Sequence, residues 1–343
     1  DGVLFRSQLY NKDFPKFIDY NRQDTMLLAK LDKKLRFLDL ANELAHDNTV
    51  LLQTTMGAVA VTEQAIINEA HQLGMVVPNR NRDEQFDTQA AGAYVAYPKQ
   101  GMHDYVGAID INSLYPSAIR ALNMGPETIV GQLRPVMTEH YIKEKQTGGS
   151  SFADAWEGLF GSLEYTSVMN MEPGTEITID WANGTSDVVS AADCWRLIFD
   201  SNKPWILSAN GTIFSNERKG VVPGLLERWY AERKELQAKM KAATTKEDIE
   251  FWDKRQLVKK INLNSAYGAL LNAGSRFFDQ RLGQSTTLCG RLVARHMAGA
   301  VNDCLTGTYD HTGQAIIYGD TDSVYFSAYP VFKEQIELGE LQW

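Results

Sequence analysis

The sequence has few cysteines and no long apolar run. Only three cysteines, Cys194, Cys289 and Cys304, stand among its 343 residues. Their odd number and wide spacing argue against a disulfide framework and against a zinc site. No window approaches the roughly 20 apolar residues that span a bilayer, and no charged segment followed by an apolar one opens the chain. These absences predict a cytoplasmic protein without membrane contact.

The chain also has less positive than negative charge. Its 34 Lys and Arg residues face 43 Asp and Glu residues, a net charge of -9, which counts against a nucleic-acid partner because phosphate binding is driven by Lys and Arg. Residues 228–260 differ, since they hold ten Lys or Arg against six Asp or Glu. The objection is therefore weaker in this segment. With 44% apolar residues, a chain of this length is expected to form two or more domains with buried cores.

The first half of the chain shows helical periodicity followed by a strand. Apolar residues spaced by three and four predict a long amphipathic helix from Phe14 to about Leu44, with further helix over 46–80. A β-like run from Tyr105 to Ile111 then precedes a helix whose first turn accepts Pro116.

The second half predicts a charged helical hairpin. Residues 223–271 have this character, with a break near "AATTKED", where Thr245 is a candidate N-cap. A helix over 291–305 follows, and then a strand, a turn and a strand over 316–326. Residues 145–215 instead show short alternating runs such as "TEITIDW", which predict small strands or an insertion.

Three aspartates carry the candidate chemistry. Asp110 lies where the first strand ends, while Asp320 and Asp322 lie in the turn of "IIYGDTDSVYF". A solvated turn is the alternative for the pair taken alone, because Asp is common in turns. If the two segments meet, their hard oxygen ligands suit Mg²⁺, which prefers a few carboxylates, waters and substrate phosphates. Two ions about 3.5–4 Å apart would serve an in-line phosphoryl displacement.

A polar face on the predicted hairpin offers a phosphate site. In "KKINLNSAYG", residues 259–268, the side chains of Lys260, Asn264 and Tyr267 lie within about 40° of one helix face. They supply a point cation, an amide and a flat amphipathic ring. Arg233 upstream adds a guanidinium fork for the same phosphates. Ordinary solvated helix charges are the alternative for Lys260 and Arg233.

Three segments in this order resemble the polymerase motifs of family B DNA polymerases, and are most similar to those of the replicative enzymes of T-even-like bacteriophages. They are "DINSLYPS", "KKINLNSAYG" and "YGDTDS". The segments "AGAYV", "NMGPET" and "KGVVPGLLERWYAERK" strengthen the resemblance. It covers most of the chain and thins over 145–205.

The resemblance implies roles for residues near the first and third motifs. Asp110 and Asp322 match the essential metal-binding carboxylates, the carbonyl of Ile111 matches a further ligand, and Asp320 matches a neighbour of lesser weight. The implied cofactor is a pair of Mg²⁺ ions, with Mn²⁺ as a substitute. Ser113, Leu114 and Tyr115 match the loop that holds the triphosphate, with Tyr115 beneath the sugar, where its ring excludes a ribose 2′-hydroxyl.

The fingers residues follow from the same resemblance. Lys260 and Arg233 match the cations that bind the triphosphate, Asn264 lines that helix, and Tyr267 with Gly268 faces the minor groove of the nascent base pair. One position departs from the pattern. Gln237 stands where a second fingers lysine is usual, and Lys241 is the candidate to compensate.

The resemblance also implies that parts of a full polymerase are missing. Tyr20 and Asp24 match the last motif of the 3′–5′ exonuclease, whose other carboxylates are absent, so we expect no proofreading by this chain alone. Only 21 residues follow Asp322, where the family places its thumb. Expected partners are primer–template DNA and dNTP. A second polypeptide with the thumb and the rest of the exonuclease, and a sliding clamp, are candidates.

The predicted fold class is α+β, a palm with an antiparallel sheet and an inserted helical-hairpin fingers domain. The implied segments are an exonuclease remnant over 1–38, an N-terminal-domain piece over 39–81, palm over 82–219 with an insertion over about 145–205, fingers over 220–272, and palm again over 273–343. The predicted function is template-directed DNA synthesis. The alternatives are a noncatalytic fragment or subunit of a split polymerase, and a two-metal nuclease.

Overall fold

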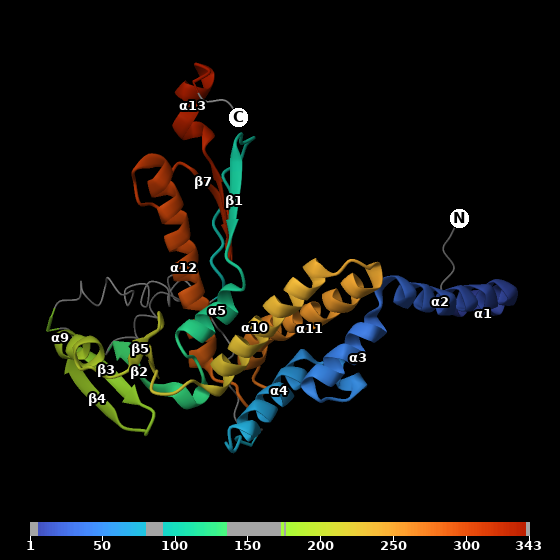
Figure 1. Ribbon diagram of the computed structural model, residues 1–343, viewed down its shortest axis with the longest axis horizontal. Helices are drawn as coiled ribbons and strands as arrows, with labels where there is room; N and C mark the ends of the chain where they lie inside the picture. The colour runs from blue at the N-terminus through green and yellow to red at the C-terminus, as the bar shows by residue number, and fades with distance from the viewer. Residues whose placement is uncertain (1–5, 80–91, 136–172, 175, 341–343) are drawn as a thin grey trace.

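The computed structural model describes residues 6–79, 92–135, 173–174 and 176–340 (Figure 1). Its helices are α1 (Arg6–Lys12), α2 (Phe14–Leu35), α3 (Phe37–Asn48), α4 (Ala58–Gln72), α5 (Leu114–Ala121), α9 (Ala191–Trp195), α10 (Val221–Ala242), α11 (Lys246–Leu270), α12 (Gln280–Thr306) and α13 (Tyr329–Glu337). Short helical segments are η1 (Leu52–Met56), η2 (Pro126–Thr128) and η4 (Arg196–Asp200). The strands are β1 (Val106–Asp110), β2 (Ile129–Pro135), β3 (Glu176–Trp181), β4 (Ser186–Ser190), β5 (Trp205–Leu207), β6 (Thr212–Ser215), β7 (Ile316–Asp320) and β8 (Ser323–Ser327).

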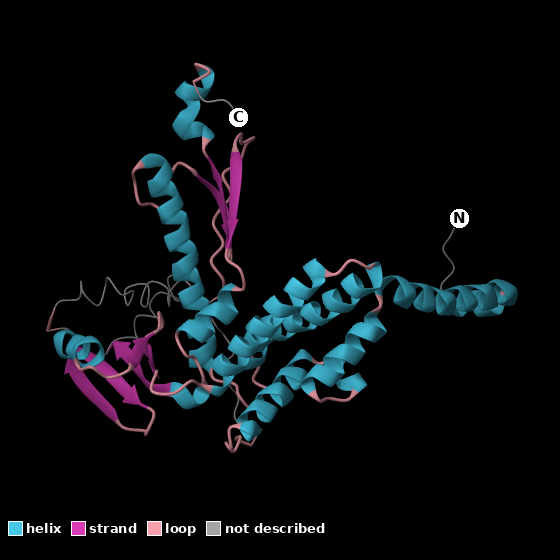
Figure 2. Cartoon of the chain, viewed as in Figure 1, coloured by secondary structure: helices cyan, strands magenta, loops and turns pink. Residues whose placement is uncertain are grey.

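Two antiparallel sheets lie apart from each other within a largely helical molecule (Figure 2). One has three strands in the order β1-β8-β7, and the other has five in the order β4-β3-β2-β6-β5. The predicted α+β class is therefore confirmed. Among the described residues, no helix is long and apolar enough to cross a bilayer.

The predicted helix from Phe14 to Leu44 is wrong in its continuity. The chain breaks at Arg36, which has a left-handed φ of 56° and donates its N–H to the carbonyl of Asp32. The break follows from burial, because α2 has no buried residue whereas α3 buries Leu44 and Ala45. The expected helix over 46–80 is likewise divided, into the end of α3, η1 and α4.

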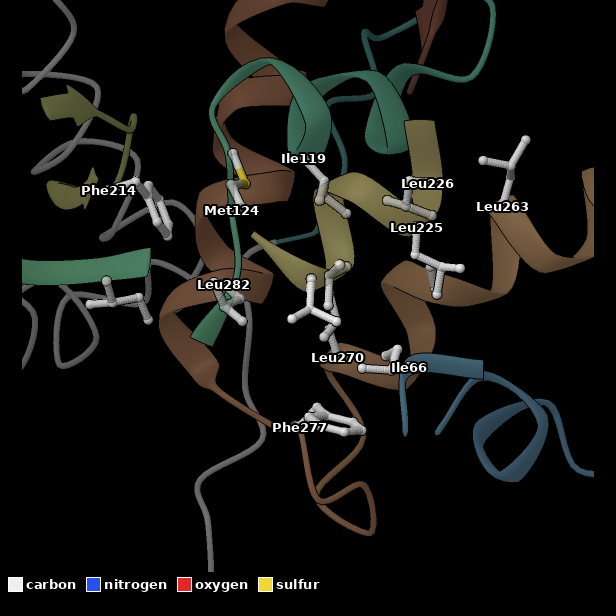
Figure 3. Close-up of a cluster of buried hydrophobic side chains, with 14 of the residues drawn as sticks. Ile66, Ile119, Met124, Phe214, Leu225, Leu226, Leu263, Leu270, Phe277 and Leu282 are labelled. Atoms are coloured by element: carbon white, nitrogen blue, oxygen red, sulfur yellow. The ribbon is translucent and has the colours of Figure 1, made fainter. Parts of the chain in front are cut away.

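The helical hairpin is confirmed. Helices α10 and α11 pack side by side, and the N–H of Asp248 donates to Thr245 Oγ1 over 3.1 Å, as the predicted N-cap requires. The hairpin is joined to the rest by a core that takes one face from each of α4, α5, α10, α11 and α12 (Figure 3). Its fully buried members include Ile119, Leu226, Leu263 and Leu282, and burying such a side chain is worth roughly 1.5–3 kcal/mol.

The three-stranded sheet stands against α12, which positions the candidate site. Ala298 of α12 packs on Ile316 and Val324 of β7 and β8. This helix begins at Gln280, earlier than the predicted 291, because Asp279 caps it by accepting from the N–H of Arg281. The extra turns carry buried residues from Leu282 to Gly290.

The five-stranded sheet has its own small core. Leu133, Ile177, Ile179 and Ile213 are fully buried in it. Glu176–Trp181 form β3, one of the small strands that the sequence predicted as an alternative to an insertion, while residues 145–172 lie outside the described residues.

Candidate active site

The three aspartates lie at one end of the three-stranded sheet. Asp110 is the last residue of β1 and pairs with Ser323 of β8, and Asp320, the last residue of β7, pairs with the same Ser323 from the other side. Asp322 immediately precedes Ser323 in the chain. The N–H of Ile111 donates to the carbonyl of Asp322 over 2.8 Å, which ties the end of β1 to the turn. The predicted meeting of the two segments is present in the structure.

The turn between β7 and β8 is held in one conformation. Thr321 has a left-handed φ of 55°, and its N–H donates to the carbonyl of Tyr94 over 2.9 Å. The N–H of Asp322 donates to the carbonyl of Asp320 over 2.6 Å. Because these bonds fix the backbone, the two carboxylates keep their spacing before any ligand arrives.

The carboxylates oppose each other's ionisation. Partial burial raises the pKa of Asp322 above its usual range, and the negative charges of Asp110 and then Asp320 raise it further. Asp110 and Asp320 are exposed. A cation placed between Asp110 and Asp322 would relieve this repulsion, so the site has the charge and the hard oxygen donors that a divalent ion requires.

The donor set fits Mg²⁺ as an ion shared with a substrate. In the part of the chain that the structure describes, no three His, Cys, Asp or Glu side chains are arranged to hold a metal by themselves. An ion here would take Asp110 and Asp322 as side-chain ligands, with the carbonyl of Ile111 nearby, and complete its shell with water or phosphate. Mg²⁺ is usually bound in this way, through one or two carboxylates plus substrate phosphates.

Tyr115 stands beside the carboxylates and against the hairpin. It follows Ser113, which has a left-handed φ of 55°, and Leu114, which is buried. The rings of Tyr115 and Tyr267 lie 4.6 Å apart at 44°. Burial first, then the charges of Tyr267 and Asp322, raise the pKa of Tyr115 to about 12. The first and second motifs therefore meet through two tyrosines, which their sequence separation did not reveal.

Two residues of α12 that the sequence analysis missed support these tyrosines. Thr287 Oγ1 lies 2.6 Å from the hydroxyl of Tyr267, a hydrogen bond between two buried helices. Gly290 faces Tyr115 so closely that an added Cβ would lie 2.7 Å from its Cε1. Gly290 lies just before the predicted helix over 291–305, so no sequence signal marked it; within the observed α12 a glycine costs about 1 kcal/mol relative to Ala, which is consistent with a packing reason.

The predicted polar face of α11 exists. Lys260, Asn264 and Gly268 are exposed, and Tyr267 is half-buried where the helix meets Tyr115. Among the described residues no carboxylate forms an ion pair with Lys260, whereas its neighbour Lys259 is bound to Asp47 and Glu232. Lys260 lies seven residues before Tyr267, or about 10 Å along the helix axis.

The remaining fingers residues lie on the facing helix α10. Arg233 Nε donates to Gln256 Oε1 of α11 over 3.3 Å, so its guanidinium sits between the two helices of the hairpin. Gln237 is half-buried one turn further on, and Lys241 is exposed.

Tyr20 and Asp24 are not brought to this site. Both lie on α2, four residues apart and so on one face, as the spacing predicted. Tyr20 is 44% exposed, and α2 extends away from the helical core, at the opposite end of the hairpin from the three-stranded sheet (Figure 1).

A three-stranded antiparallel sheet thus ends in carboxylates, and the helical hairpin that exposes Lys260 meets the segment after β1 through the contact of Tyr115 with Tyr267. The chain belongs to DNA polymerase family B, whose family model matches residues 49–338. It is 27% identical over 350 residues to the DNA-directed DNA polymerase of Escherichia phage RB69, an alignment that covers 96% of this chain and 36% of the relative. The DNA-directed DNA polymerase of Enterobacteria phage T4 is 26% identical, with 99% and 38% covered.

A solved structure agrees on the fold. The family B DNA polymerase from the archaeon Pyrobaculum calidifontis matches with a TM-score of 0.52 at 20% identity, covering 91% of this chain and 32% of that one. The chain thus spans about a third of the length of these relatives.

Proposed function

We propose that this chain carries the catalytic centre of a template-directed DNA polymerase. It would transfer the nucleotidyl group of a dNTP to a primer 3′-hydroxyl. The observation that carries the proposal is the meeting of the segments of Asp110 and Asp322 at one end of the sheet, together with the contact of Tyr115 and Tyr267, which brings in the helix that exposes Lys260. A two-metal nuclease shares the carboxylates but leaves Lys260, Asn264 and Tyr115 without a role.

Each group has a task in this reaction. Asp110, Asp322 and the carbonyl of Ile111 would hold two Mg²⁺ ions, with Mn²⁺ as a substitute. When bound, such ions polarise the attacking hydroxyl and neutralise the leaving oxygens. Lys260 and Arg233 would grip the triphosphate, with Asn264 lining the same helix. Because Gln237 replaces a lysine, this grip has one cation fewer unless Lys241 contributes.

The tyrosines would select and align the nucleotide. Tyr115 would lie beneath the sugar, with Ser113 and Leu114 shaping the phosphate loop, and a 2′-hydroxyl would clash with its ring. Tyr267 and Gly268 would face the minor groove of the new base pair. The tilted ring contact between Tyr115 and Tyr267 and the hydrogen bond between Tyr267 and Thr287 support this role, because both rings are held before substrate binds.

The division into domains is proposed in the same terms. Helices α10 and α11 lie within the expected fingers over 220–272, and both strand segments of the three-stranded sheet lie within the palm segments 82–219 and 273–343. The piece over 39–81 would belong to the N-terminal domain, and the residues to about 38, with Tyr20 and Asp24, to an exonuclease remnant without proofreading activity of its own.

A second candidate function is a noncatalytic or partner-dependent subunit of a split polymerase. The observation that favours it is α2, which has no buried residue and exposes large apolar side chains, including Leu28 at 70%. A second polypeptide carrying the thumb and the rest of the exonuclease would then complete the enzyme. Primer–template DNA and dNTP are the proposed ligands, and a sliding clamp is a further proposed partner.

The test is Mg²⁺-dependent primer extension by the purified chain, alone and with an added thumb-bearing fragment. We expect extension in at least the second arm, loss of it in Asp110→Asn, and retention in Asp303→Asn, a control at an exposed aspartate of α12. Degradation of the DNA without extension in either arm would establish a nuclease instead. Binding without extension in both arms would establish the noncatalytic alternative.

A further inference from the structure

The back of α11 is joined to α3 by a ladder of ion pairs. Three acidic residues of α3 occur once per turn, and each meets a cation of α11: Asp39 with Lys254 at 2.8 Å, Glu43 with Arg255 at 3.1 Å, and Asp47 with Lys259 at 2.6 Å. We call these six residues the α3–α11 ladder. It attaches the fingers hairpin to the segment that precedes the palm.

Asp47 differs from the other two acids in the number of its contacts to α11. Its Oδ1 accepts from Lys259 Nζ over 2.6 Å, and its Oδ2 accepts from Asn262 Nδ2 over 2.8 Å. Lys259 Nζ also meets Glu232 Oε2 of α10 at 2.5 Å. One carboxylate therefore holds two residues of α11 one turn apart and, through Lys259, also connects to α10.

The side chains that make these contacts are less exposed than those of the outer pair, Asp39 and Lys254. The side chain of Lys259 is 13% exposed and that of Asp47 is 22% exposed, and Asn262 is 2% exposed. The Asp39–Lys254 pair is 42% and 25% exposed. Exposed pairs contribute little because solvent screens them, whereas hydrogen bonds to a charged group with little solvent access are stronger. Among the three acids of the ladder, Asp47 is therefore expected to contribute most to holding α11 against α3.

The contacts of Asp47 lie on the opposite side of α11 from the proposed triphosphate face. At roughly 100° per residue, the mean direction of Lys259 and Asn262 is about 150° from that of Lys260 and Asn264. Apolar packing of Leu44, Val61 and Val258 fills the interface beneath. Such packing favours contact without directional preference, so the rotation of α11 about its axis depends on directional contacts. Those to α3 are the ladder pairs, the bond from Asn262 Nδ2 to Asp47 and the bond from Asn48 Nδ2 to Asn262 Oδ1 at 3.2 Å, and Asp47 makes two of them.

We propose that Asp47 is a positioning residue for nucleotide binding: it fixes the rotation of α11 so that Lys260 and Asn264 face the incoming triphosphate. Asp47 touches no substrate and acts through Lys259 and Asn262. This inference rests on the proposed function for its effect on dNTP binding. The rotation itself does not depend on that function.

The kinetic test compares Asp47→Ala with Asp39→Ala. Both remove an aspartate of α3 and an ion pair to α11, but only the first releases two residues of that helix. We expect Asp47→Ala to raise the KM for dNTP about tenfold, as the loss of one to two charge-assisted hydrogen bonds implies, with kcat changed less than twofold. Asp39→Ala should change KM less than twofold.

A distance measurement tests the rotation without using activity. Nitroxide labels would be placed at Glu250→Cys on α11 and Val293→Cys on α12, two exposed positions, with the exposed Cys304 replaced by Ser; Cys194 and Cys289 are buried. A rotation of roughly 30° moves a side chain at a radius of about 6 Å by about 3 Å. We expect the distance distribution to shift or broaden by this amount in Asp47→Ala and to stay as in the wild type in Asp39→Ala.

The outcomes separate this proposal from the proposed function. Unchanged distances in Asp47→Ala would overturn the positioning role. A lowered KM for dNTP in Asp47→Ala, or an equal rise of KM in Asp39→Ala, would overturn it as well. A wild-type chain that neither binds nor incorporates dNTP would refute the polymerase function, while the distance distributions would still decide the role of Asp47. If Asp47→Ala does not fold, Asp47→Asn, which keeps one acceptor oxygen for the two donors, should show a smaller shift in the same direction.

Discussion

Replacing Gly290 by alanine should disturb the active centre through Tyr115. The added Cβ would lie 2.7 Å from Tyr115 Cε1, 3.2 Å from its Cδ1 and 3.4 Å from Leu114 Cδ2. Carbon atoms in favourable contact are separated by about 3.5–4.0 Å, so the tyrosine ring must move by about 1 Å. It would move away from α12, toward Tyr267 and the proposed sugar site.

The expected effect on stability is small because two contributions oppose each other. Alanine is favoured over glycine in a helix by about 1 kcal/mol, while overpacking a close contact costs about 1–3 kcal/mol. The net loss is about 1 kcal/mol, which corresponds to a decrease in Tm of roughly 2 °C for a chain of this size. The effect on catalysis should be larger, because a 1 Å misplacement can cost about a hundredfold in rate.

The assay is single-nucleotide primer extension with dNTP and with rNTP, together with thermal unfolding. We expect Gly290→Ala to lower kcat/KM for dNTP about 10- to 100-fold. The matched control is Gly299→Ala on the same helix, where an added Cβ would lie 2.9 Å from the ring of Tyr309, a residue 60% exposed whose hydroxyl lies 2.9 Å from Nδ1 of the exposed His296 and which contacts no described residue of the candidate site. It should keep wild-type activity. Wild-type kcat/KM in Gly290→Ala, or an equal loss in Gly299→Ala, would refute the reasoning.

Three further predictions follow from the site. Asp322→Asn should abolish extension yet raise the Tm of the metal-free protein at pH 7. Burial and the acidic neighbours raise the pKa of Asp322, so its ionised form destabilises the folded protein at pH values above the ordinary carboxyl pKa of about 3.9. The difference in Tm between variant and wild type should therefore vanish below that pH. A variant less stable than the wild type at pH 7 would contradict this. Gln237→Lys should lower the KM for dNTP by about three- to tenfold, because it adds a cation one turn after Arg233. A KM that rises or stays constant would show that position 237 does not face the triphosphate. Tyr115→Ala should admit ribonucleotides in a competition assay between rNTP and dNTP, and unchanged sugar selectivity would remove the steric role of the ring.

Local sequence patterns were sufficient for the parts of the fold that local interactions decide. The alternation of apolar residues predicted β7 and β8, and Thr245 marked the start of α11, because capping and strand periodicity involve neighbours within a few residues. The face shared by Lys260, Asn264 and Tyr267 followed from helical periodicity alone.

The break at Arg36 and the early start of α12 were not predicted. The break depends on which helix faces are buried, because the apolar spacing of α2 and α3 is the same on either side of Arg36. The start of α12 is instead marked locally by the Asp279 cap, a signal that the sequence analysis missed. Periodicity shows that a face is apolar, but it does not show whether another element covers that face.

What the sequence by itself determined is the chemistry of this protein: the motif order, the acidic turn, and the cation on the hairpin, all of which are properties of short segments. The tertiary structure alone decided how these segments are supported. Gly290 and Thr287 are placed against Tyr115 and Tyr267, and Asp47 bonds to Lys259 over a separation of 212 residues. No short-range pattern encodes such pairs, because contacts between distant segments exist only after the common core has brought their helices together.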